Sequence, residues 1–314
     1  MRLETLKLRV FTQFMFALLF LVASLSSANA RETKPAPAIW KIDGAQSDIY
    51  FFGSFHILPK DLVWRTAELD AALQSAQQLD FEINIDDAQN PLKMTTLIQQ
   101  HGFLPAGESL RKMLAIEYRV KLEAAAIELG LPIQALDRMR PWLVALTITS
   151  LSAMKQTTKP GEKVNPAAAT GEQAGADIHL WNWAKANNKE RGTLETLESQ
   201  IQIFADLSRE QELQYLVMTL QQTEKLDESL NILLNAWVTG DTKKLDKSLN
   251  GEMDAFPAMR KALFDERHKK WMPQIEAMLN DGKTHVIIVG AAHLVGKGSV
   301  IDLLRAKGIK VEGP

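Results

Sequence analysis

Two short segments near opposite ends of the chain share one pattern: an apolar run, a glycine, two further residues and a histidine. The first is Gly53-Ser-Phe-His56, which follows the letters IYFF, and the second is Gly290-Ala-Ala-His293, which follows HVIIV. Short apolar runs of this kind are typical of buried strands. In an open α/β sheet, ligands bind beyond the carboxyl ends of the strands. If the two strands are neighbours, the pattern brings both imidazoles to one site.

The repetition of the motif favours a shared function for the two histidines. Imidazole is a common metal ligand and the usual general base near neutral pH, whereas a single histidine in a turn is more often a hydrogen-bonding surface residue. Two copies in a chain with only six histidines favour the first interpretation. Glycine contributes either a positive φ or room for another group to approach the backbone. A phosphate loop is excluded, because Gly296-Lys297 is followed by Gly298 instead of Ser or Thr, and no G-x-G-x-x-G is present.

The rest of the pattern predicts a mixed α/β fold with a large helical insertion. Residues 38–43 and 47–53 form two short alternating runs around a turn, which is typical of a hairpin. We expect strands also over 79–86, 131–137, 191–196, 285–290 and 309–313, and helices over 61–78, 91–130, 141–155, 177–188, 197–281 and 299–307. The chain then has a central mixed sheet, an N-terminal hairpin, a C-terminal strand–helix–strand and a helical insertion over about 197–281. Residues 155–176 are polar and contain Pro and Gly, which predicts a mobile loop within one domain over 31–314.

Residues 1–30 have the organisation of a cleavable signal peptide. A basic start precedes an apolar run over 14–23, and Ala28-Asn29-Ala30 is a small-residue cleavage site. The apolar run is short for a membrane span, so an uncleaved anchor is the less favoured alternative. We expect cleavage after Ala30, membrane contact only through this segment before cleavage, and a periplasmic or secreted mature protein.

The composition agrees with export and argues against nucleic acid. Lys and Arg number 36, Asp and Glu number 38, and the net charge is −2, whereas a nucleic-acid partner requires a basic surface. The chain has no cysteine, so neither disulfides nor thiolate metal sites are available to it.

The two motif segments, FFGSFHILP and VIIVGAAHLVGKGSVIDLLRAKGIKV, resemble those of the TraB/GumN family, which also includes the PrgY proteins and the animal Tiki metalloproteases. Other segments match in the same order: LDFEIN, GADIHLWNWAKANNKERGTLETLESQ, AWVTGD and LFDERHKKWMPQIEAML. The resemblance extends from about Ala38 to Val311. It implies a metal-dependent hydrolase site on a mixed α/β core.

The resemblance also supplies the candidate site residues by position. The catalytic candidates are Glu82, Arg267 and Glu195, and the candidate metal ligands are His56, His293 and Glu82. One departure from the family pattern stands beside Arg267: the family often has Asn where this chain has His268, which either replaces the amide or adds a third imidazole.

Each candidate has a structural interpretation beside the functional one. Glu82 is a metal ligand or general base, or a solvated carboxylate on an exposed sheet face, and Glu195 has the same alternatives. Arg267 holds a substrate carboxylate or a developing oxyanion through its planar fork, or forms a salt bridge. Glu198 is expected to cap the next helix near Thr196.

Two histidines with one or two carboxylates predict a divalent ion such as zinc, manganese or cobalt, which lowers the pKa of bound water to about 7. The expected function is an exported, metal-dependent hydrolase of peptidase type acting on a peptide or protein. The alternative is a non-catalytic periplasmic binding protein for a peptide or glycan, with the helical insertion as its cap or groove. A structural role in polysaccharide export has only the GumN name in its favour.

Overall fold

The computed structural model describes residues 35–44, 47–158, 171, 174–222, 226–251, 253 and 256–314. The predicted signal peptide lies outside these residues, as does most of the predicted loop over 155–176. Within the described chain, helix α8 extends to Thr157 and helix α9 begins at Ala176.

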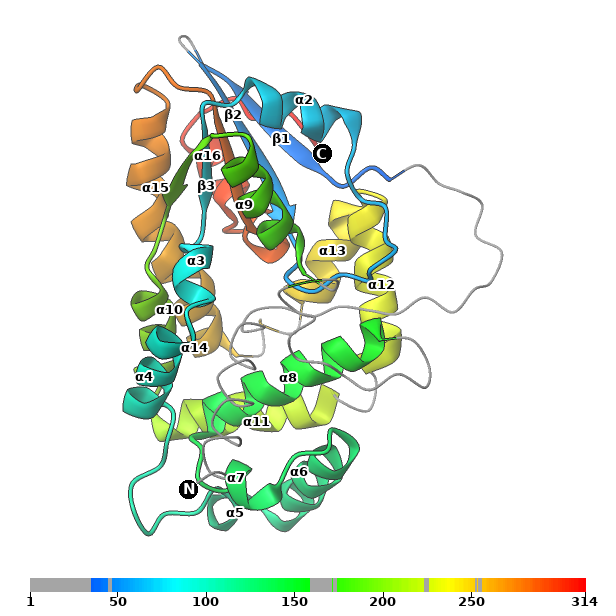
Figure 1. The fold of residues 1–314 in the computed structure, drawn as a ribbon, viewed down its shortest axis with the longest axis vertical. Coiled ribbons are helices and arrows are strands. Elements are labelled where there is room, and N and C mark those ends of the chain that lie inside the picture. The colour runs from blue at the N-terminus through cyan, green and yellow to red at the C-terminus, as the bar shows by residue number, and fades with distance from the viewer. Residues whose placement is uncertain are drawn as a thin grey trace, which may run out of the picture.

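A five-stranded mixed sheet forms the upper half of the molecule in Figure 1, in the strand order β1-β2-β5-β3-β4. The strands are β1 (Ile39–Asp43), β2 (Asp48–Ser54), β3 (Gln78–Phe81), β4 (Glu190–Thr193) and β5 (His285–Gly290). β1 and β2 form the predicted antiparallel hairpin, and the other neighbours are parallel. Ser54 lies opposite Gly290, and Phe81 lies opposite Ile288. The carboxyl ends of β2, β5 and β3 therefore meet at one edge.

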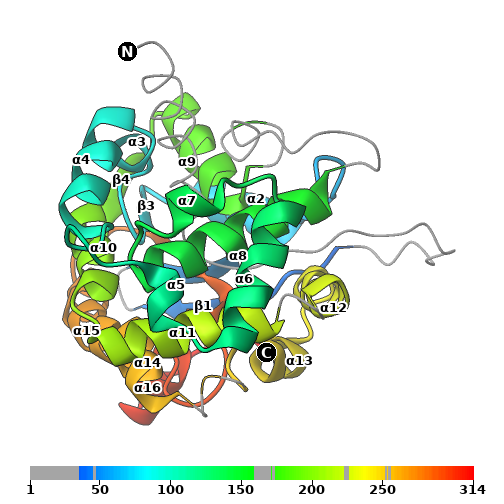
Figure 2. The same cartoon turned by 90° about the horizontal axis from the view of Figure 1, so that it is seen from below.

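Helices surround the sheet and extend beyond that edge. α2 and α9 cover one face of the sheet and α15 and α16 the other, while α4 to α8, α10 and α11 form a helical half beyond the carboxyl edge (Figures 1 and 2). Their bounds are α2 Ala67–Ser75, α3 Ile85–Ala88, α4 Pro91–His101, α5 Leu110–Met113, α6 Ile116–Glu128, α7 Ile133–Leu136, α8 Pro141–Thr157, α9 Ala176–Ala186, α10 Leu197–Ala205, α11 Arg209–Gln222, α12 Leu226–Val238, α13 Thr242–Leu249, α14 Pro257–Arg260, η5 Lys261–Asp265, α15 Glu266–Met278, η6 Ala291–His293 and α16 Val300–Ala306. The predicted α/β mixed fold class is confirmed.

Four predicted strands differ from the structure, one of them only in its end, since β4 stops at Thr193 instead of residue 196. The strand expected over 131–137 is wrong, because this segment forms the helical turn α7 in the helical half. Its backbone N–H groups find local carbonyl partners there, such as Ile133 for Asp137 at 2.9 Å, whereas an extended chain away from the sheet would leave them unpaired. The strand expected over 79–86 ends at Phe81, since Asn84 caps α3 by accepting from the backbone N–H of Asp87. The last expected strand, 309–313, is reduced to one bridge between Glu312 and Lys41.

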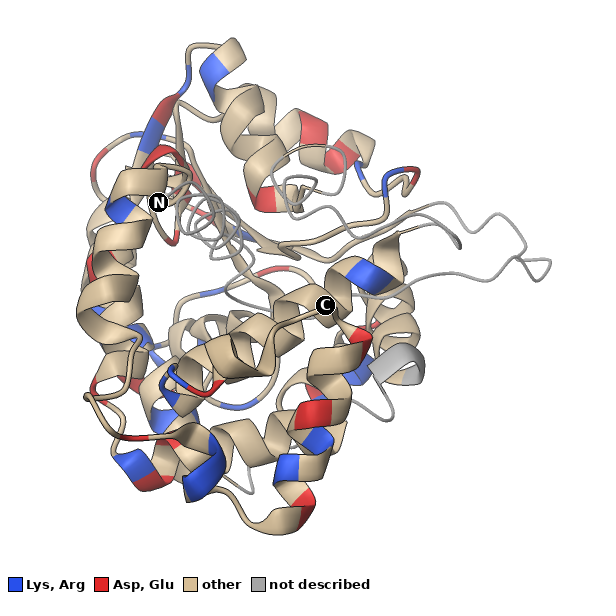
Figure 3. Cartoon of the chain, turned by 60° about the horizontal axis from the view of Figure 1, so that its bottom comes forward, with Lys and Arg blue, Asp and Glu red and all other residues tan. Residues whose placement is uncertain are grey.

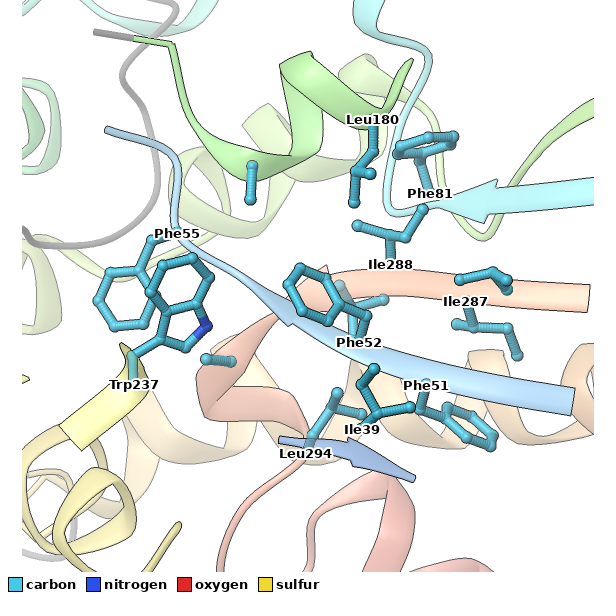
Figure 4. Close-up of a cluster of buried hydrophobic side chains, with 14 of the residues drawn as sticks. Ile39, Phe51, Phe52, Phe55, Phe81, Leu180, Trp237, Ile287, Ile288 and Leu294 are labelled. Carbon is cyan, nitrogen blue, oxygen red and sulfur yellow. The ribbon is translucent and has the colours of Figure 1, made fainter. Parts of the chain in front are cut away.

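The hydrophobic core of the described residues falls into two clusters, one around the sheet and one in the helical half. In the sheet cluster, Phe51 and Phe52 project to opposite faces of β2, and Phe81 and Ile288 lie on the side of Leu180 from α9 (Figure 4). The helical cluster includes Trp142 of α8, which stacks on Phe204 of α10 with ring centroids 5.8 Å apart. The carboxyl edge of the sheet lies where the two clusters meet.

The charged residues are spread over the fold. Lys and Arg are intermixed with Asp and Glu along the ribbon seen in Figure 3, in line with their nearly equal numbers in the sequence. Of the helices that the structure describes, none combines the length and the apolar character needed to cross a bilayer.

Candidate functional site

Four predicted site residues follow the ends of four strands at the same edge of the sheet. His56 lies two residues after β2, Glu82 directly after β3, Glu195 two residues after β4, and His293 at the end of η6, which continues from β5. Because these strands are parallel and in register, the four positions lie at one edge of the sheet. The sequence predicts this for the two histidines, since each motif follows the end of a strand.

The first motif needs its glycine because two segments of the protein, β2 and η6, approach each other closely at this point. A Cβ at Gly53 would lie 2.9 Å from the Cα of Ala291 and 3.1 Å from its Cβ, so only glycine lets β2 pack this closely against η6. Neither motif glycine has a positive φ, and that of Gly290 is −53°. Gly53 is therefore used for the close approach of another backbone segment and not for a positive φ.

Arg267 of α15 connects two carboxylates and one histidine inside the protein. Its Nε donates to both carboxylate oxygens of Glu195, at 3.0 and 3.1 Å, and one terminal nitrogen donates to Glu82 Oε2 at 2.5 Å. The other terminal nitrogen lies 2.9 Å from Nε2 of His293. Arg267 is only 2% exposed, and its guanidinium carbon lies 4.8 Å from the ring centroid of Trp271. Arg267 therefore forms a buried salt bridge with two carboxylates from the strand ends and not with the charged neighbours on its own helix.

The hydrogen bonds around His293 determine which ring nitrogens carry protons. An arginine only donates, so Nε2 of His293 accepts from Arg267, and the neutral ring carries its proton on Nδ1. The backbone carbonyl of Gly298 only accepts, so His268 carries its proton on Nδ1, 2.9 Å away. It follows that Nδ1–H of His293 donates to Nε2 of His268, also at 2.9 Å. Arg267, His293, His268 and the Gly298 carbonyl form one chain with a single direction of donation.

Burial keeps both of these histidines neutral. It lowers the pKa of His293 well below its usual value, and the charge of Arg267 lowers it further. Burial also lowers the pKa of His268 to about 4, against the opposing effect of its bond to Gly298. Burial raises the pKa of Glu82, but the charge of Arg267 lowers it more, so this carboxylate is ionised with a pKa well below its usual range.

His56 stands in a different environment from His293. Its Nδ1 lies 2.7 Å from Oδ2 of Asp177 in the first turn of α9, and its side chain is 16% exposed. Burial lowers the pKa of His56, but the adjacent charge of Asp177 raises it more, so the net pKa is above its usual value. Gly175 permits this pair, because a Cβ there would lie 2.3 Å from the Cα of His56 and 2.4 Å from Oδ1 of Asp177.

A cavity of about 60 Å³ lies against His56 at the junction of the two clusters. Three of its lining residues carry buried polar atoms for which the described part of the chain offers no hydrogen-bond partner: Oγ of Ser54, Nε2 of His56 and Oδ1 of Asp177. Glu82 also lines the cavity, and its Oε1 lies 3.8 Å from Nε2 of His293. Glu82 therefore connects the cavity to the buried His293. His293 itself is not among the lining residues.

The three predicted metal ligands do not fit a metal ion equally well. His56 fits a metal-binding imidazole, because Nε2 is available and the other nitrogen faces a carboxylate, the usual outer partner of such a ligand. His293 has both nitrogens in hydrogen bonds, and Glu82 accepts from Arg267, Gln200 and the backbone N–H of Gly290. Among the described residues, no group of three or more His, Asp or Glu side chains is placed to hold a metal ion. The arrangement as it stands therefore does not fit a three-residue metal centre.

Sequence reasoning missed three residues of the site. Asp177 lies in the segment GADIHLWNWAKANNKERGTLETLESQ that carries the family resemblance, and Gly175-Ala-Asp177 at a helix start was an available signal. Ser54 lies within the first glycine–histidine motif. Gln200 donates to Oε2 of Glu82 at 2.9 Å from the interior of α10, a contact that no local pattern indicates.

Comparisons with known proteins agree with the family resemblance that the motif segments carry. The model of the TraB/PrgY/gumN family matches residues 38–313. The chain is 23% identical to the Escherichia coli (strain K12) protein YbaP over 288 residues, which cover 92% of this chain and 99% of that protein. It is 24% identical to human metalloprotease TIKI1 over 318 residues, covering 84% of this chain and 59% of that protein, and 24% identical to zebrafish (Danio rerio) TIKI1 over 316 residues, covering 84% and 60%. No solved structure gives a significant match. With the family model matching nearly the whole of the described chain, this protein belongs to the TraB/PrgY/gumN family.

Proposed function

We propose that the protein is an exported hydrolase that cleaves peptide or amide bonds, with His56 as its proton-transfer residue. The observation that carries the proposal is the pairing of His56 with Asp177 on one nitrogen while the other nitrogen lines a cavity without a partner in the described chain. Membership of a family that includes relatives named metalloproteases supports hydrolysis as the reaction. The signal-peptide pattern of residues 1–30 supports export.

The pair can move one proton through the reaction. With Nδ1–H donating to Asp177, Nε2 of neutral His56 takes a proton from a water molecule whose oxygen attacks the substrate carbonyl carbon. The carbon–nitrogen bond then breaks, and Nε2 returns the proton to the departing amine. Asp177 holds the ring in the required tautomer and stabilises the imidazolium that forms between the two transfers.

Dependence on a divalent ion, with zinc, manganese or cobalt as the candidates, stays a prediction. The names of the Tiki relatives support it. His56 would bind such an ion through Nε2, whereas Glu82 or His293 would first have to give up hydrogen bonds that the structure contains. The proton transfers assigned to His56 therefore involve no ion, and metal analysis of the purified protein after dialysis against mixed divalent ions measures the dependence directly.

The first test compares His56→Gln with wild-type protein on a peptide library, with cleavage followed by mass spectrometry. Loss of the transferring nitrogen is expected to reduce the cleavage rate by about 10²- to 10⁴-fold. His101→Gln, at the end of α4 and outside the cavity lining, is the matched control and should retain the wild-type rate. Equal rates for wild-type protein and a folded His56→Gln variant would contradict the assignment. Tight peptide binding without any cleavage would favour the periplasmic binding protein instead.

Export has a separate test. In the host, the protein should be recovered from the periplasm or the medium with Arg31 as its first residue, determined by N-terminal sequencing. Recovery from the cytoplasm with an intact N-terminus would contradict the signal-peptide assignment.

A further inference from the structure

We propose that the cavity beside His56 binds an aliphatic side chain, such as that of leucine, isoleucine or methionine. The inference rests on the proposed function, because it assigns this side chain to the substrate, next to the bond that His56 acts on. It would make the cavity the element that selects the substrate.

The first argument is the composition of the wall. Ile83 and Ile85 follow β3, Met94 projects from α4, and Leu197 and Ile201 come from α10. Met94, Leu197 and Ile201 are at most 4% exposed, so they form a fixed part of the core and not a surface patch. An apolar wall contributed by three separate segments favours an apolar group over water.

The second argument is the position of the polar groups. Ser54, His56 and Asp177 each present a polar atom that has no partner in the described chain. A substrate backbone amide can supply the missing bonds, since Oδ1 of Asp177 accepts from an N–H and Oγ of Ser54 can donate to a carbonyl. Backbone recognition by these polar groups would place the side chain against the apolar wall.

The third argument is size. The cavity, at about 60 Å³, is well below the roughly 150 Å³ that holds a benzene ring, so it favours an aliphatic side chain over an aromatic one.

The test measures binding and cleavage separately on the full mature protein. Binding of the N-acetyl, N-methylamide derivatives of leucine, alanine, phenylalanine and lysine is followed by NMR through the methyl signal of Met94. Leucine is expected to bind at least tenfold more tightly than the other three, in line with the discrimination that apolar pockets achieve. Cleavage of a peptide series that varies the same residue should show the same order in kcat/KM.

Met94→Ala provides the second readout, because removing this side chain from the wall enlarges the cavity. It is expected to raise the phenylalanine-to-leucine ratio of kcat/KM at least tenfold, whereas Met218→Ala, at a similarly buried methionine of α11 outside the cavity lining, should leave the ratio unchanged. The wild-type binding series keeps the inference testable if Met94→Ala does not fold.

The outcomes separate the two proposals. Leucine-selective binding without any cleavage would support the pocket and overturn the hydrolase. Cleavage with equal kcat/KM across the peptide series, or tighter binding of the lysine derivative, would overturn the pocket and leave the hydrolase in place.

Discussion

At the scale of single residues, the two motif histidines have different environments although their motifs are alike. His56 has one nitrogen on Asp177 and one toward a cavity, while His293 is fully buried with both nitrogens in hydrogen bonds. The sequence predicts that both lie at one edge of the sheet, and the structure agrees. What each can do depends on partners such as Asp177 and Arg267, which are distant in the sequence. The assignment of both histidines to one metal ion stays a prediction.

The chain of hydrogen bonds from Arg267 to the Gly298 carbonyl leads to a testable prediction about His268. Replacing His268 by Ala removes the acceptor of the buried Nδ1–H of His293, which should cost about 1–3 kcal/mol of unfolding free energy in urea denaturation. Asn keeps an acceptor, so His268→Asn should lose less. His101→Ala is the control, expected within about 0.5 kcal/mol of wild type. Equal losses for Ala and Asn would contradict the hydrogen-bond assignment.

His285, at the opposite end of β5, should make stability depend on pH. Burial lowers its pKa, but Asp80 at 2.7 Å and Asp281 at 3.0 Å raise it more, so its net pKa is above the usual value of 6.5. The folded protein then binds this proton more tightly than the unfolded chain does. The resulting stabilisation is complete below pH 6.5 and is lost as the pH rises through the raised pKa.

The measurement is urea unfolding of wild-type and His285→Gln protein between pH 5 and 9. The difference in unfolding free energy should be largest near pH 5 and shrink toward pH 9. A difference that stays constant over this range would show that His285 contributes no proton-linked stability.

At the scale of elements, apolar periodicity predicted the buried strands and the long helices but not where short elements end. β5 and α8 appear where the sequence predicts them, because a fully apolar run or a long helical pattern needs no distant partner to be recognised. The segment 131–137 has a strand-like composition and becomes α7, whose apolar residues pack in the helical cluster. A short apolar run carries no information about whether a neighbouring strand is available.

The cap at the start of α10 can be tested by mutation, and this helix supplies part of the cavity wall. The sequence predicts that Glu198 caps this helix near Thr196. The reciprocal cap is formed by Thr196 and Ser199, while Glu198 in the first turn contacts Thr196 and pairs with Lys93 at 2.9 Å. Thr196→Ala should therefore lower the unfolding free energy by about 1 kcal/mol, a decrease in Tm of about 2–4 °C. Thr196→Ser keeps the hydroxyl and should restore most of it, and an equal loss in both variants would contradict the cap.

At the scale of the whole molecule, Arg267 joins α15, the last helix of the predicted insertion, to the sheet. Its bonds to Glu82 and Glu195 tie α15 to the ends of β3 and β4, between the two hydrophobic clusters. All three side chains are at most 7% exposed, so removal of the guanidinium would leave two buried carboxylates without their counter-ion.

Arg267→Ala should accordingly lower the unfolding free energy by about 3–5 kcal/mol in urea denaturation. The control is Lys93→Ala, whose more exposed ion pairs with Asp87 and Glu198 should contribute only about 0–1 kcal/mol. Similar losses in the two variants would mean that burial gives Arg267 no special role in stability.

The sequence by itself determined the local part of this protein: the strands that end in glycine, the histidines three residues later, and the family to which those segments belong. These features follow from the apolar or polar character of residues close in the chain, which alone specifies strand or helix and the type of side chain at its end. Only the tertiary structure decided which side chains meet. It placed Asp177 on His56, Arg267 on two glutamates and His268 on His293, because burial makes each polar group take whichever partner the packing brings near, and that partner is distant in the sequence.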